Sequence, residues 1–276
     1  MNGKKLIIAF AVFVCICQLF DSCFLQSTET DSDEINRIRD RIREEQCIIH
    51  AGGYISNDDG VFYTYTNSKD ALLNCYAKGN KISEIDFRIS SDNCLVCTHE
   101  WNMMYKDGIS IGNEPVTKDE FLECCTWGGF TSMWLGDLVD FLEEHSDFLF
   151  VTDIKDDNFT ACRIIADFCP EWKDNFIIQI YHPHEYNIIR RLGFKNIIFT
   201  LYAASEKERD LNNLLKFANN NELVGFTYWH YWTDIYLEPF LQAGYDSYIH
   251  TVNDPAQRTT FLNSGVAAIY TDTVDN

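Results

Sequence analysis

Positive charge is scarce in this chain of 276 residues, which has 22 Lys and Arg against 42 Asp and Glu and a formal net charge of −20 at pH 7. Nucleic-acid binding depends on clustered Lys and Arg, and docking to anionic lipid depends on basic segments. The composition therefore argues against nucleic acid and against anionic lipid as electrostatic partners. An anionic substrate stays compatible with it if the site supplies local positive charge or a metal ion.

Nucleotide-binding motifs are absent as well. No G-x-G-x-x-G follows the first β-rich run, no phosphate-binding P-loop occurs, and there is no internal repeat or low-complexity tract. Apolar residues nevertheless make up 46% of the chain, which is typical of a globular protein. The length allows one large domain or two small ones, and single α/β barrels commonly have about 250 residues.

Long apolar runs are missing after residue 20. The one such run, Leu6–Phe20, follows Lys4 and Lys5 and is typical of the apolar region of an export signal, being short for a membrane span. We predict a signal peptide over residues 1–23, without assigning its cleavage position, and a secreted, extracellular protein. An uncleaved signal anchor is the alternative. The mature chain is then expected to have no stable membrane span.

Eight cysteines lie beyond the predicted signal: Cys47, Cys75, Cys94, Cys97, Cys124, Cys125, Cys162 and Cys169. An even number in an exported chain is typical of a disulfide set, so we expect most of them to be paired, with connectivity left open. Cys94-x-x-Cys97 lacks a second pair at zinc-finger spacing. Asn158-Phe159-Thr160 is the one glycosylation sequon and predicts a glycan at Asn158 after export.

Short β-rich runs alternate with helical segments. The predicted strands are Cys47–His50, Ser83–Arg88, Phe148–Asp153, Phe176–Tyr181, Asn196–Tyr202, Leu223–Trp229, Ser247–Asn253 and Ala267–Asp272; predicted helices include Ser68–Ala77, Ser132–Glu144, His184–Leu192, Glu206–Asn219, Tyr236–Gln242 and Ala256–Leu262. Eight strands alternating with helices indicate parallel βαβ units. We predict an α/β fold, a (β/α)8 TIM barrel over residues 46–276, with an open doubly wound sheet as the alternative.

Three segments stand outside this alternation. Residues 24–45 are predicted to be a polar linker, Gln26–Asp33, followed by an amphipathic helix on which Ile35, Ile38 and Ile42 recur at helical spacing. The apolar run Cys94–Thr98 predicts a hairpin after the second strand. The long, aromatic-rich stretch from Trp101 to Met133 is predicted to be either a lid or lipid-contacting loop or a packed excursion.

Carboxylates gather at the ends of two neighbouring predicted strands, where barrel enzymes carry their chemistry. Glu84 and Asp86 are two residues apart on one strand, so their side chains face the same way, and Asp153 ends the next barrel strand. Carboxylates aimed at one point repel unless a cation lies between them, and an all-oxygen set prefers Mg²⁺ or Ca²⁺. We predict one divalent cation on these three residues. The alternative is a carboxylate set bridged by Lys155 or Arg88.

Two histidines accompany the carboxylates: His50 at the end of the first strand and His99 after the Cys94–Thr98 run. Imidazole titrates near neutral pH, so one histidine can act as base while the other acts as acid. A metal that polarises a phosphoryl oxygen between two such groups suits phosphodiester cleavage. The remaining strand-end residues are candidates for substrate binding: Lys155, Arg88, Gln179, Tyr181, Tyr202, Trp229 and Asn253.

In their residues and order, these motifs resemble the glycerophosphodiester phosphodiesterases of the phosphatidylinositol-phospholipase-C-like superfamily. The matching segments are His50–Gly53, Asn67–Ala71, Glu84–Phe87, Ser91–Val96, His99–Trp101, Asp153–Lys155, Thr251–Asp254 and Gly265–Asp272. The resemblance implies a (β/α)8 barrel, a divalent metal on the residues matching Glu84, Asp86 and Asp153, acid–base histidines at the positions of His50 and His99, and a lysine near the phosphate at Lys155.

One position departs from that pattern. The family usually carries H-R-G on the first strand, with the arginine on the phosphate, whereas this chain has Ala51. The Asp153-x-Lys155 pair and the aromatic end of the sixth strand also resemble the secreted sphingomyelinase-D-like phospholipases. Those enzymes release a lipid head group and can form a cyclic phosphate.

The sequence thus predicts a secreted, metal-dependent phosphoric diester hydrolase acting on a small-molecule or lipid substrate, either a glycerophosphodiester or a phospholipid head group. A barrel of the same family that binds phospholipid or another phosphodiester without cleaving it is the alternative, motivated by Ala51. A zinc amidohydrolase would need His-x-His on the first strand. A glycosidase could use Glu84 and Asp153 but would not need two histidines or Lys155.

Overall fold

The structure is a computed structural model that describes residues 30–273, and the statements below concern this part of the chain. The predicted signal peptide, residues 1–23, and the first part of the predicted linker lie outside the described residues. No helix within the described part is both long enough and apolar enough to cross a membrane.

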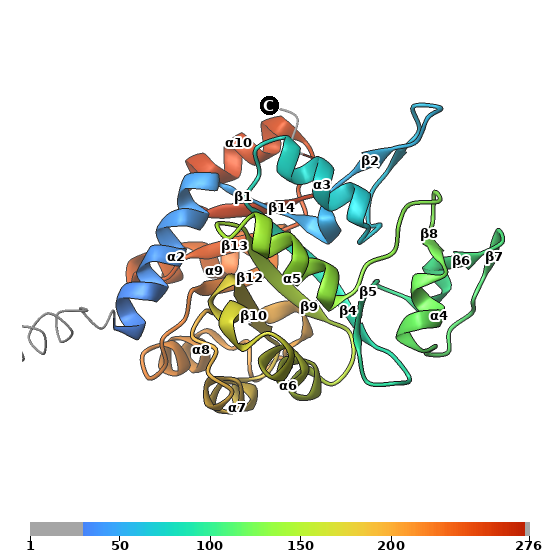
Figure 1. The fold of residues 1–276 in the computed structure, drawn as a ribbon. Helices are drawn as coiled ribbons and strands as arrows, with labels where there is room; N and C mark the ends of the chain where they lie inside the picture. The colour runs from blue at the N-terminus through green and yellow to red at the C-terminus, as the bar shows by residue number, and fades with distance from the viewer. Residues whose placement is uncertain (1–29, 274–276) are drawn as a thin grey trace, which may run out of the picture.

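Eight parallel strands form a closed barrel (Figure 1). They are β1 (Cys47–Ile49), β4 (Ile82–Ile89), β9 (Leu149–Ile154), β10 (Phe176–Ile180), β11 (Ile197–Thr200), β12 (Gly225–Trp229), β13 (Ser247–His250) and β14 (Ala268–Thr271). Each strand pairs with its neighbours along the chain, and the pairs β1–β14 and β1–β4 close the ring. The predicted strands and the TIM barrel are confirmed.

Helices surround this barrel. They are α3 (Lys69–Ala77), α5 (Leu135–Glu144), α6 (Asn158–Phe168), α7 (Tyr186–Arg191), α8 (Leu211–Ala218), α9 (Thr233–Ala243) and α10 (Pro255–Asn263). Helix α6 adds one to the predicted set, because Ala161, Cys162 and Ile165 recur at helical spacing and are buried in the core. Short 3₁₀ turns follow four of the strands and position site residues: η1 (His50–Gly52), η4 (Pro183–Glu185), η5 (Leu201–Ala203) and η6 (His230–Trp232).

Helix α2 (Asp31–Glu45) covers the N-terminal end of the barrel. The predicted face of Ile35, Ile38 and Ile42 is buried against side chains that fill the barrel interior. The helix begins inside the segment predicted as linker, so that prediction is wrong for residues 31–33. The reason is a capping box, in which the Thr30 hydroxyl accepts from the Asp33 backbone N–H at 3.2 Å and the Asp33 carboxylate accepts from that of Thr30 at 3.1 Å.

Two excursions interrupt the alternation at the other end of the barrel. The first is a hairpin of β2 (Ile55–Ser56) and β3 (Phe62–Tyr63). The second begins where β5 (Leu95–Cys97) folds back on β4, as the hairpin prediction required, and continues through η2 (Trp101–Met103), β6 (Met104–Lys106), β7 (Ile109–Ser110), α4 (Lys118–Leu122) and β8 (Cys125–Thr126).

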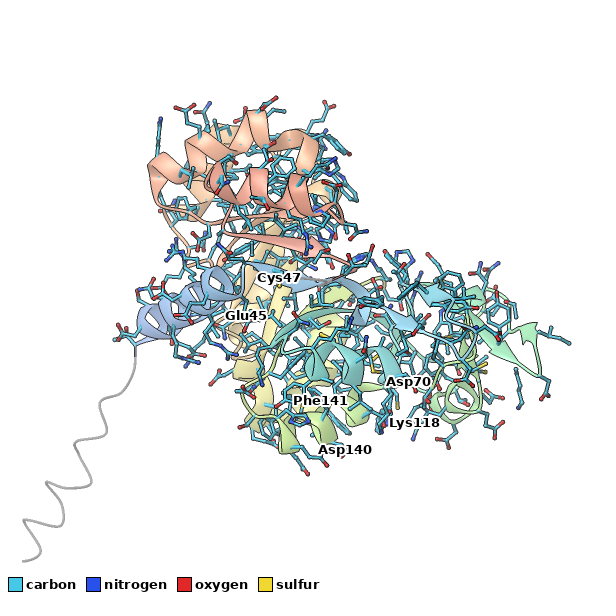
Figure 2. The ribbon with its side chains drawn as sticks, turned by 90° about the horizontal axis from the view of Figure 1, so that it is seen from above. Glu45, Cys47, Asp70, Lys118, Asp140 and Phe141 are labelled. Carbon is cyan, nitrogen blue, oxygen red and sulfur yellow. The ribbon has the colours of Figure 1, made fainter. Side chains whose placement is uncertain are left out.

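The second excursion is a packed unit. Strands β7, β6 and β8 form a three-stranded antiparallel sheet, and Trp101, Met104 and Phe121 make a small core of their own beneath it. The packed excursion predicted for residues 101–133 is therefore confirmed, while contact of this segment with lipid stays a prediction. Figures 1 and 2 both show this sheet projecting from the side of the barrel away from α2.

The expected disulfides are not found. All eight described cysteines are free thiols, and several are already engaged as hydrogen-bond donors: the Sγ of Cys162 points to Asn158 Oδ1 at 3.7 Å, and that of Cys169 to the Ile165 carbonyl at 3.3 Å. Cys75 and Cys97 are buried in the main core, where a thiol packs as a small apolar side chain. An even count and an export signal predicted pairing, but these thiols serve as core residues and local donors.

Candidate active site

A cavity of about 510 Å³ opens at the C-terminal end of the barrel strands. Its lining residues are His50, Tyr65, His99, Asp153, Lys155, Tyr202, Trp229, His250, Thr251, Asn253 and Asp272. They come from the ends of at least six strands and from the loops that follow them, which is where barrel enzymes bind their substrates. Both predicted histidines and several of the predicted substrate-binding residues therefore meet at one place.

Three buried carboxylates cluster at this end of the barrel, and one of them, Asp153, lines the cavity. Glu84 and Asp86 lie on β4, and Asp153 lies opposite Asp86 on β9. Ligand atoms of all three lie within 4.8 Å of one another. Hydrogen bonds orient two of these carboxylates. The Ala51 backbone N–H donates to Glu84 Oε2 at 2.7 Å, and the Asn67 amide donates to Asp86 Oδ2 at 2.8 Å.

Lys155 lies against this cluster, and its Nζ is 2.8 Å from both Asp86 Oδ1 and Asp153 Oδ2. The bridging lysine that the sequence offered as an alternative is therefore present. One ammonium group does not balance three carboxylates, however: burial first, and then the charge of Asp86, raise the pKa of Glu84 to about 8.

The donor set fits a divalent cation. Glu84 Oε1 is fully buried and has no hydrogen-bond partner, and Asp86 Oδ1 has only the ion pair with Lys155. An unpartnered carboxylate oxygen in such a position is costly unless a cation completes it. Three carboxylates without nitrogen or sulfur ligands match the preference of Mg²⁺ or Ca²⁺.

Two tyrosines predicted to bind substrate instead position the third carboxylate. The Tyr181 hydroxyl donates to Asp153 Oδ1 at 2.5 Å, and that of Tyr202 donates to Oδ2 at 3.1 Å. Burial opposes the charge of Asp153, but Lys155 and Tyr181 outweigh it and lower its pKa. Tyr181 does not line the cavity, so the structure assigns it to Asp153, whereas Tyr202 contacts both Asp153 and the cavity.

His50 faces the cavity from η1 as part of a hydrogen-bonded chain. Its Nδ1 lies 2.7 Å from Asp272 Oδ1, and its Nε2 lies 3.9 Å from Glu84 Oε2. Asn253 donates to the second oxygen of Asp272 at 2.7 Å, so this predicted substrate-binding residue also orients that carboxylate. Burial disfavours the charged imidazole, but Asp272 and Glu84 outweigh it and raise the pKa of His50 to about 9.

His99 lies on the cavity wall in a different environment. Burial dominates there and lowers its pKa, although Asp86 acts in the opposite direction. Its nearest carboxylate is that of Glu100, 3.5 Å from Nδ1. The two histidines therefore favour opposite protonation states, which suits one acid and one base in the same site.

Four residues that line the cavity were not among the predicted site residues: Tyr65, His250, Thr251 and Asp272. The Tyr65 ring lies edge-on between the histidines, with centroids 4.6 Å from His50 and 5.0 Å from His99. It comes from the loop after β3, outside the strand-end pattern, so no signal pointed to it. His250 is buried at the end of β13, where it stacks on Tyr270 at 3.9 Å; as the last residue of its strand, it could have been found by the rule that found the others.

Two other predicted substrate-binding residues lie away from the cavity. Arg88 donates to the His99 carbonyl at 2.9 Å and pairs with Glu100 at 2.7 Å, so it fixes the loop that carries His99. Gln179 is fully buried within the barrel and accepts from the Thr200 hydroxyl. The strand-end pattern predicted both at the site, but neither lines the cavity. Arg88 is bound by protein groups, whereas the Nε2 of Gln179 is buried without a hydrogen-bond partner. Trp229 does line the cavity.

Burial bears on two further residues, Ala51 and Asn158. Ala51 is fully buried with a left-handed φ of 49°, and its contribution to the site is the backbone N–H on Glu84. The predicted glycan at Asn158 is not supported, because Asn158 is buried and its Nδ2, the atom that would carry the glycan, donates to the Gln179 carbonyl at 3.1 Å.

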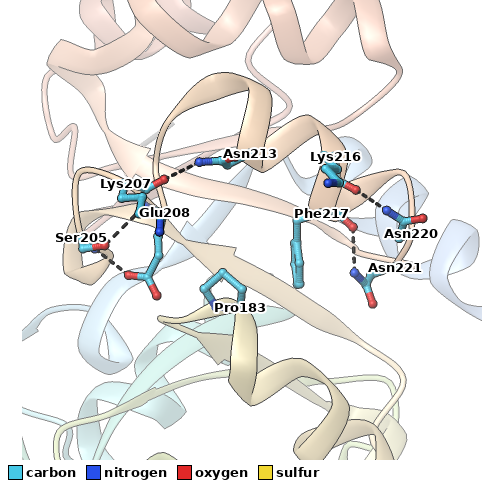
Figure 3. Close-up of a pocket in the computed structure, with 9 residues that line it drawn as sticks. All are labelled: Pro183, Ser205, Lys207, Glu208, Asn213, Lys216, Phe217, Asn220 and Asn221. Carbon is cyan, nitrogen blue, oxygen red and sulfur yellow. Dashed lines mark hydrogen bonds between the residues drawn. The ribbon is translucent and has the colours of Figure 1, made fainter.

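A second hollow, of about 550 Å³, lies on the flank of the molecule beside α8 (Figure 3). Its three asparagines donate to backbone carbonyls of their own segment: Asn213 to Lys207, Asn220 to Lys216 and Asn221 to Phe217. The hollow brings together no cluster of carboxylates and histidines. The chemistry therefore belongs to the cavity at the barrel mouth.

Fold and site together define a (β/α)8 barrel with a carboxylate and histidine cluster at its mouth. No known family profile and no curated protein matches the sequence. Solved structures do match. A glycerophosphodiester phosphodiesterase from Parabacteroides distasonis is 18% identical with a TM-score of 0.63, over 82% of this chain and 93% of that one. One from Thermotoga maritima is 15% identical with a TM-score of 0.62, over 82% and 94%.

A phosphodiesterase from Oleispira antarctica, solved with its product sn-glycerol-3-phosphate, is 15% identical with a TM-score of 0.61, over 82% of this chain and 92% of that one. The chain therefore has the fold of the glycerophosphodiester phosphodiesterases over most of its length. The fold predicted from the family resemblance of the sequence motifs is therefore confirmed.

Proposed function

We propose that this protein is a metal-dependent phosphoric diester hydrolase that cleaves glycerophosphodiesters or phospholipid head groups. The observation that carries the proposal is that His50, His99 and Asp153 line one cavity, and that Glu84 and Asp86 lie beside Asp153 in one carboxylate cluster. The fold shared with glycerophosphodiester phosphodiesterases supports it. The product bound to the Oleispira protein, sn-glycerol-3-phosphate, suggests the class of substrate.

Glu84, Asp86 and Asp153 would hold one Mg²⁺ or Ca²⁺, which would withdraw charge from a phosphoryl oxygen when bound. His50, charged through Asp272, can donate a proton from Nε2 to the leaving alkoxide, while neutral His99 can accept a proton from the water that attacks phosphorus. Lys155 supplies a positive charge on the cavity wall for the phosphate. Asp272 and Asn253 hold the imidazole of His50 in place.

Export is part of the proposal and rests on the sequence of residues 1–23. It places the enzyme outside the cell, where free glycerophosphodiesters and exposed lipid head groups would be its substrates. Recovery of the chain from culture medium, shortened at its N-terminus, tests this part independently of catalysis.

The direct test is hydrolysis of a panel of glycerophosphodiesters and lysophospholipids by the wild-type protein and two variants. His50→Ala and His99→Ala should each lower kcat by about 10²–10⁴-fold, which is the usual effect of a positioned acid or base. His184→Ala is the matched control, because His184 is exposed on η4 and does not line the cavity. If neither diester nor lysolipid is cleaved by folded, metal-loaded protein, the non-cleaving alternative replaces this proposal.

A further inference from the structure

Large apolar side chains are exposed on both excursions at the barrel mouth. Phe62 on the β2–β3 hairpin is 68% exposed and its neighbour Val61 is 49% exposed, while Ile109 on β7 is 73% exposed. Isolated apolar residues on a surface need no explanation, but side chains of this size gathered on projecting hairpins do. Trp127, at the turn after β8, adds a partly exposed indole.

The topology places these side chains around the cavity. The β2–β3 hairpin follows the turn that carries His50, and the β6–β8 sheet follows His99. Loops that follow parallel barrel strands leave from the C-terminal end, where the cavity opens. Figures 1 and 2 show the sheet on the side away from α2.

Contacts join the two excursions into one surface. The Trp127 indole N–H donates to the Thr64 carbonyl at 3.1 Å, and the Tyr63 ring lies 5.1 Å from that of Trp127 and 5.4 Å from that of Phe130. The same hairpin segment continues to Tyr65, whose ring touches both histidines. The exposed tips are thus connected through packed aromatic side chains to the catalytic cavity.

Negative charge beside Val61 and Ile109 indicates which kind of lipid surface these side chains can contact. Asp58 and Asp59 precede Val61, Asp107 precedes Ile109, all three are exposed, and the chain carries a net charge of −20. Such a surface is repelled by anionic lipid. A zwitterionic bilayer accepts apolar and aromatic side chains at the boundary between head groups and acyl chains without requiring basic residues.

We propose that Val61, Phe62, Ile109 and Trp127 form a docking surface that seats the cavity mouth on a zwitterionic phospholipid bilayer. One part of this inference rests on the proposed function: if the protein is a phosphodiesterase, docking would present membrane lipid to it as the substrate. The docking itself requires no catalysis. It can therefore fail or succeed independently of hydrolysis.

The test is co-sedimentation with phosphatidylcholine vesicles in the presence of chelator, so that no metal-dependent turnover intervenes. Phe62→Thr and Ile109→Thr keep a strand-compatible residue and should each weaken binding about tenfold or more, as expected for the loss of one buried large apolar side chain. Leu241→Gln is the matched control: Leu241 is exposed on α9, beside Gly265 at the N-terminal end of β14, and its loss should leave binding unchanged.

Binding to phosphatidylglycerol vesicles should be weaker than to phosphatidylcholine. The proposal is overturned if wild-type protein does not sediment with phosphatidylcholine, if it prefers the anionic vesicles, or if Phe62→Thr and Ile109→Thr bind as well as Leu241→Gln. A concentration-dependent dimer that both strand variants abolish would also overturn it, because the surface would then serve a second copy of the chain. Circular dichroism of each variant shows that the fold is retained.

Discussion

Glu84 is the residue whose environment most directly calls for a cation. It is fully buried, one oxygen has no partner, and burial together with Asp86 raises its pKa to about 8. We predict that Glu84→Gln abolishes both hydrolysis and binding of Mg²⁺ or Ca²⁺, while the melting temperature in chelator at pH 7 stays about equal, because the neutral amide replaces a carboxyl that is mostly protonated at that pH without the metal. Titration calorimetry and thermal unfolding in chelator measure the two effects.

The control for this variant is Glu143→Gln, since Glu143 is an exposed residue of α5. A purely structural role for Glu84 would show itself as a lower melting temperature in chelator together with unchanged metal affinity. That result would remove Glu84 from the metal site.

Tyr65 contacts both histidines of the candidate active site. Its ring touches both imidazoles, and its backbone has a left-handed φ of 64°, a strained conformation that persists only where the surroundings enforce it. We predict that Tyr65→Phe keeps most of the activity, whereas Tyr65→Ala lowers kcat tenfold or more with little change in KM. Steady-state kinetics of the two variants measure this. Equal losses in both would assign the role to the hydroxyl group instead of the ring.

At the scale of elements, hydrogen bonds of Asn67 connect the segment before α3 to β4. Its amide donates to Asp86 Oδ2 at 2.8 Å, its carbonyl oxygen accepts from the Asp86 backbone N–H at 2.9 Å, and its own N–H donates to the Ala51 carbonyl at 3.1 Å. A metal ligand held in this way depends on its supporting hydrogen bonds. The segment therefore connects η1, the hairpin and the carboxylate cluster.

We predict that Asn67→Gly lowers metal affinity about 10–100-fold, the usual effect of losing a partner that orients a ligand. Glycine is the informative substitution, because Asn67 has a left-handed φ of 47° that glycine adopts without strain. Titration calorimetry against wild type measures the change. Unchanged affinity would show that Asp86 does not need this support.

Helix α2 is the element that stabilises the opposite end. Ile38 is fully buried against the barrel interior, so Ile38→Ala should lower the free energy of unfolding by about 2–5 kcal/mol. Because this end lies away from the cavity, kcat should not change. Denaturant unfolding and kinetics measure the two quantities, and Glu44→Ala, at an exposed position of the same helix, is the control. If Ile38→Ala lowered kcat without changing the free energy of unfolding, α2 would not have a purely stabilising role.

At the scale of the whole molecule, the sequence predicted what periodicity and strand ends determine. Eight apolar runs indicated the barrel. Glu84, Asp86 and Asp153 lie together because neighbouring parallel strands share one end, and Asp153 lines one cavity with His50 and His99. Arg88 and Gln179 also satisfied that rule, but neither lines the cavity, because Arg88 binds the loop of His99 and Gln179 is buried against Thr200; only the packed structure reveals this. Tyr65 came from a loop whose conformation has no periodic signal. The free thiols show that cysteine number alone does not determine pairing.

The central claim is that the three carboxylates hold a divalent cation on which phosphodiester hydrolysis depends. The most direct measurement is the rate of glycerophosphocholine hydrolysis before chelation, after exhaustive chelation, and after Mg²⁺ or Ca²⁺ is returned. Chelation should abolish the rate, and one of the two ions should restore it in wild type but not in Glu84→Gln. An unchanged rate after exhaustive metal removal, in protein shown by elemental analysis to be metal-free, would contradict it.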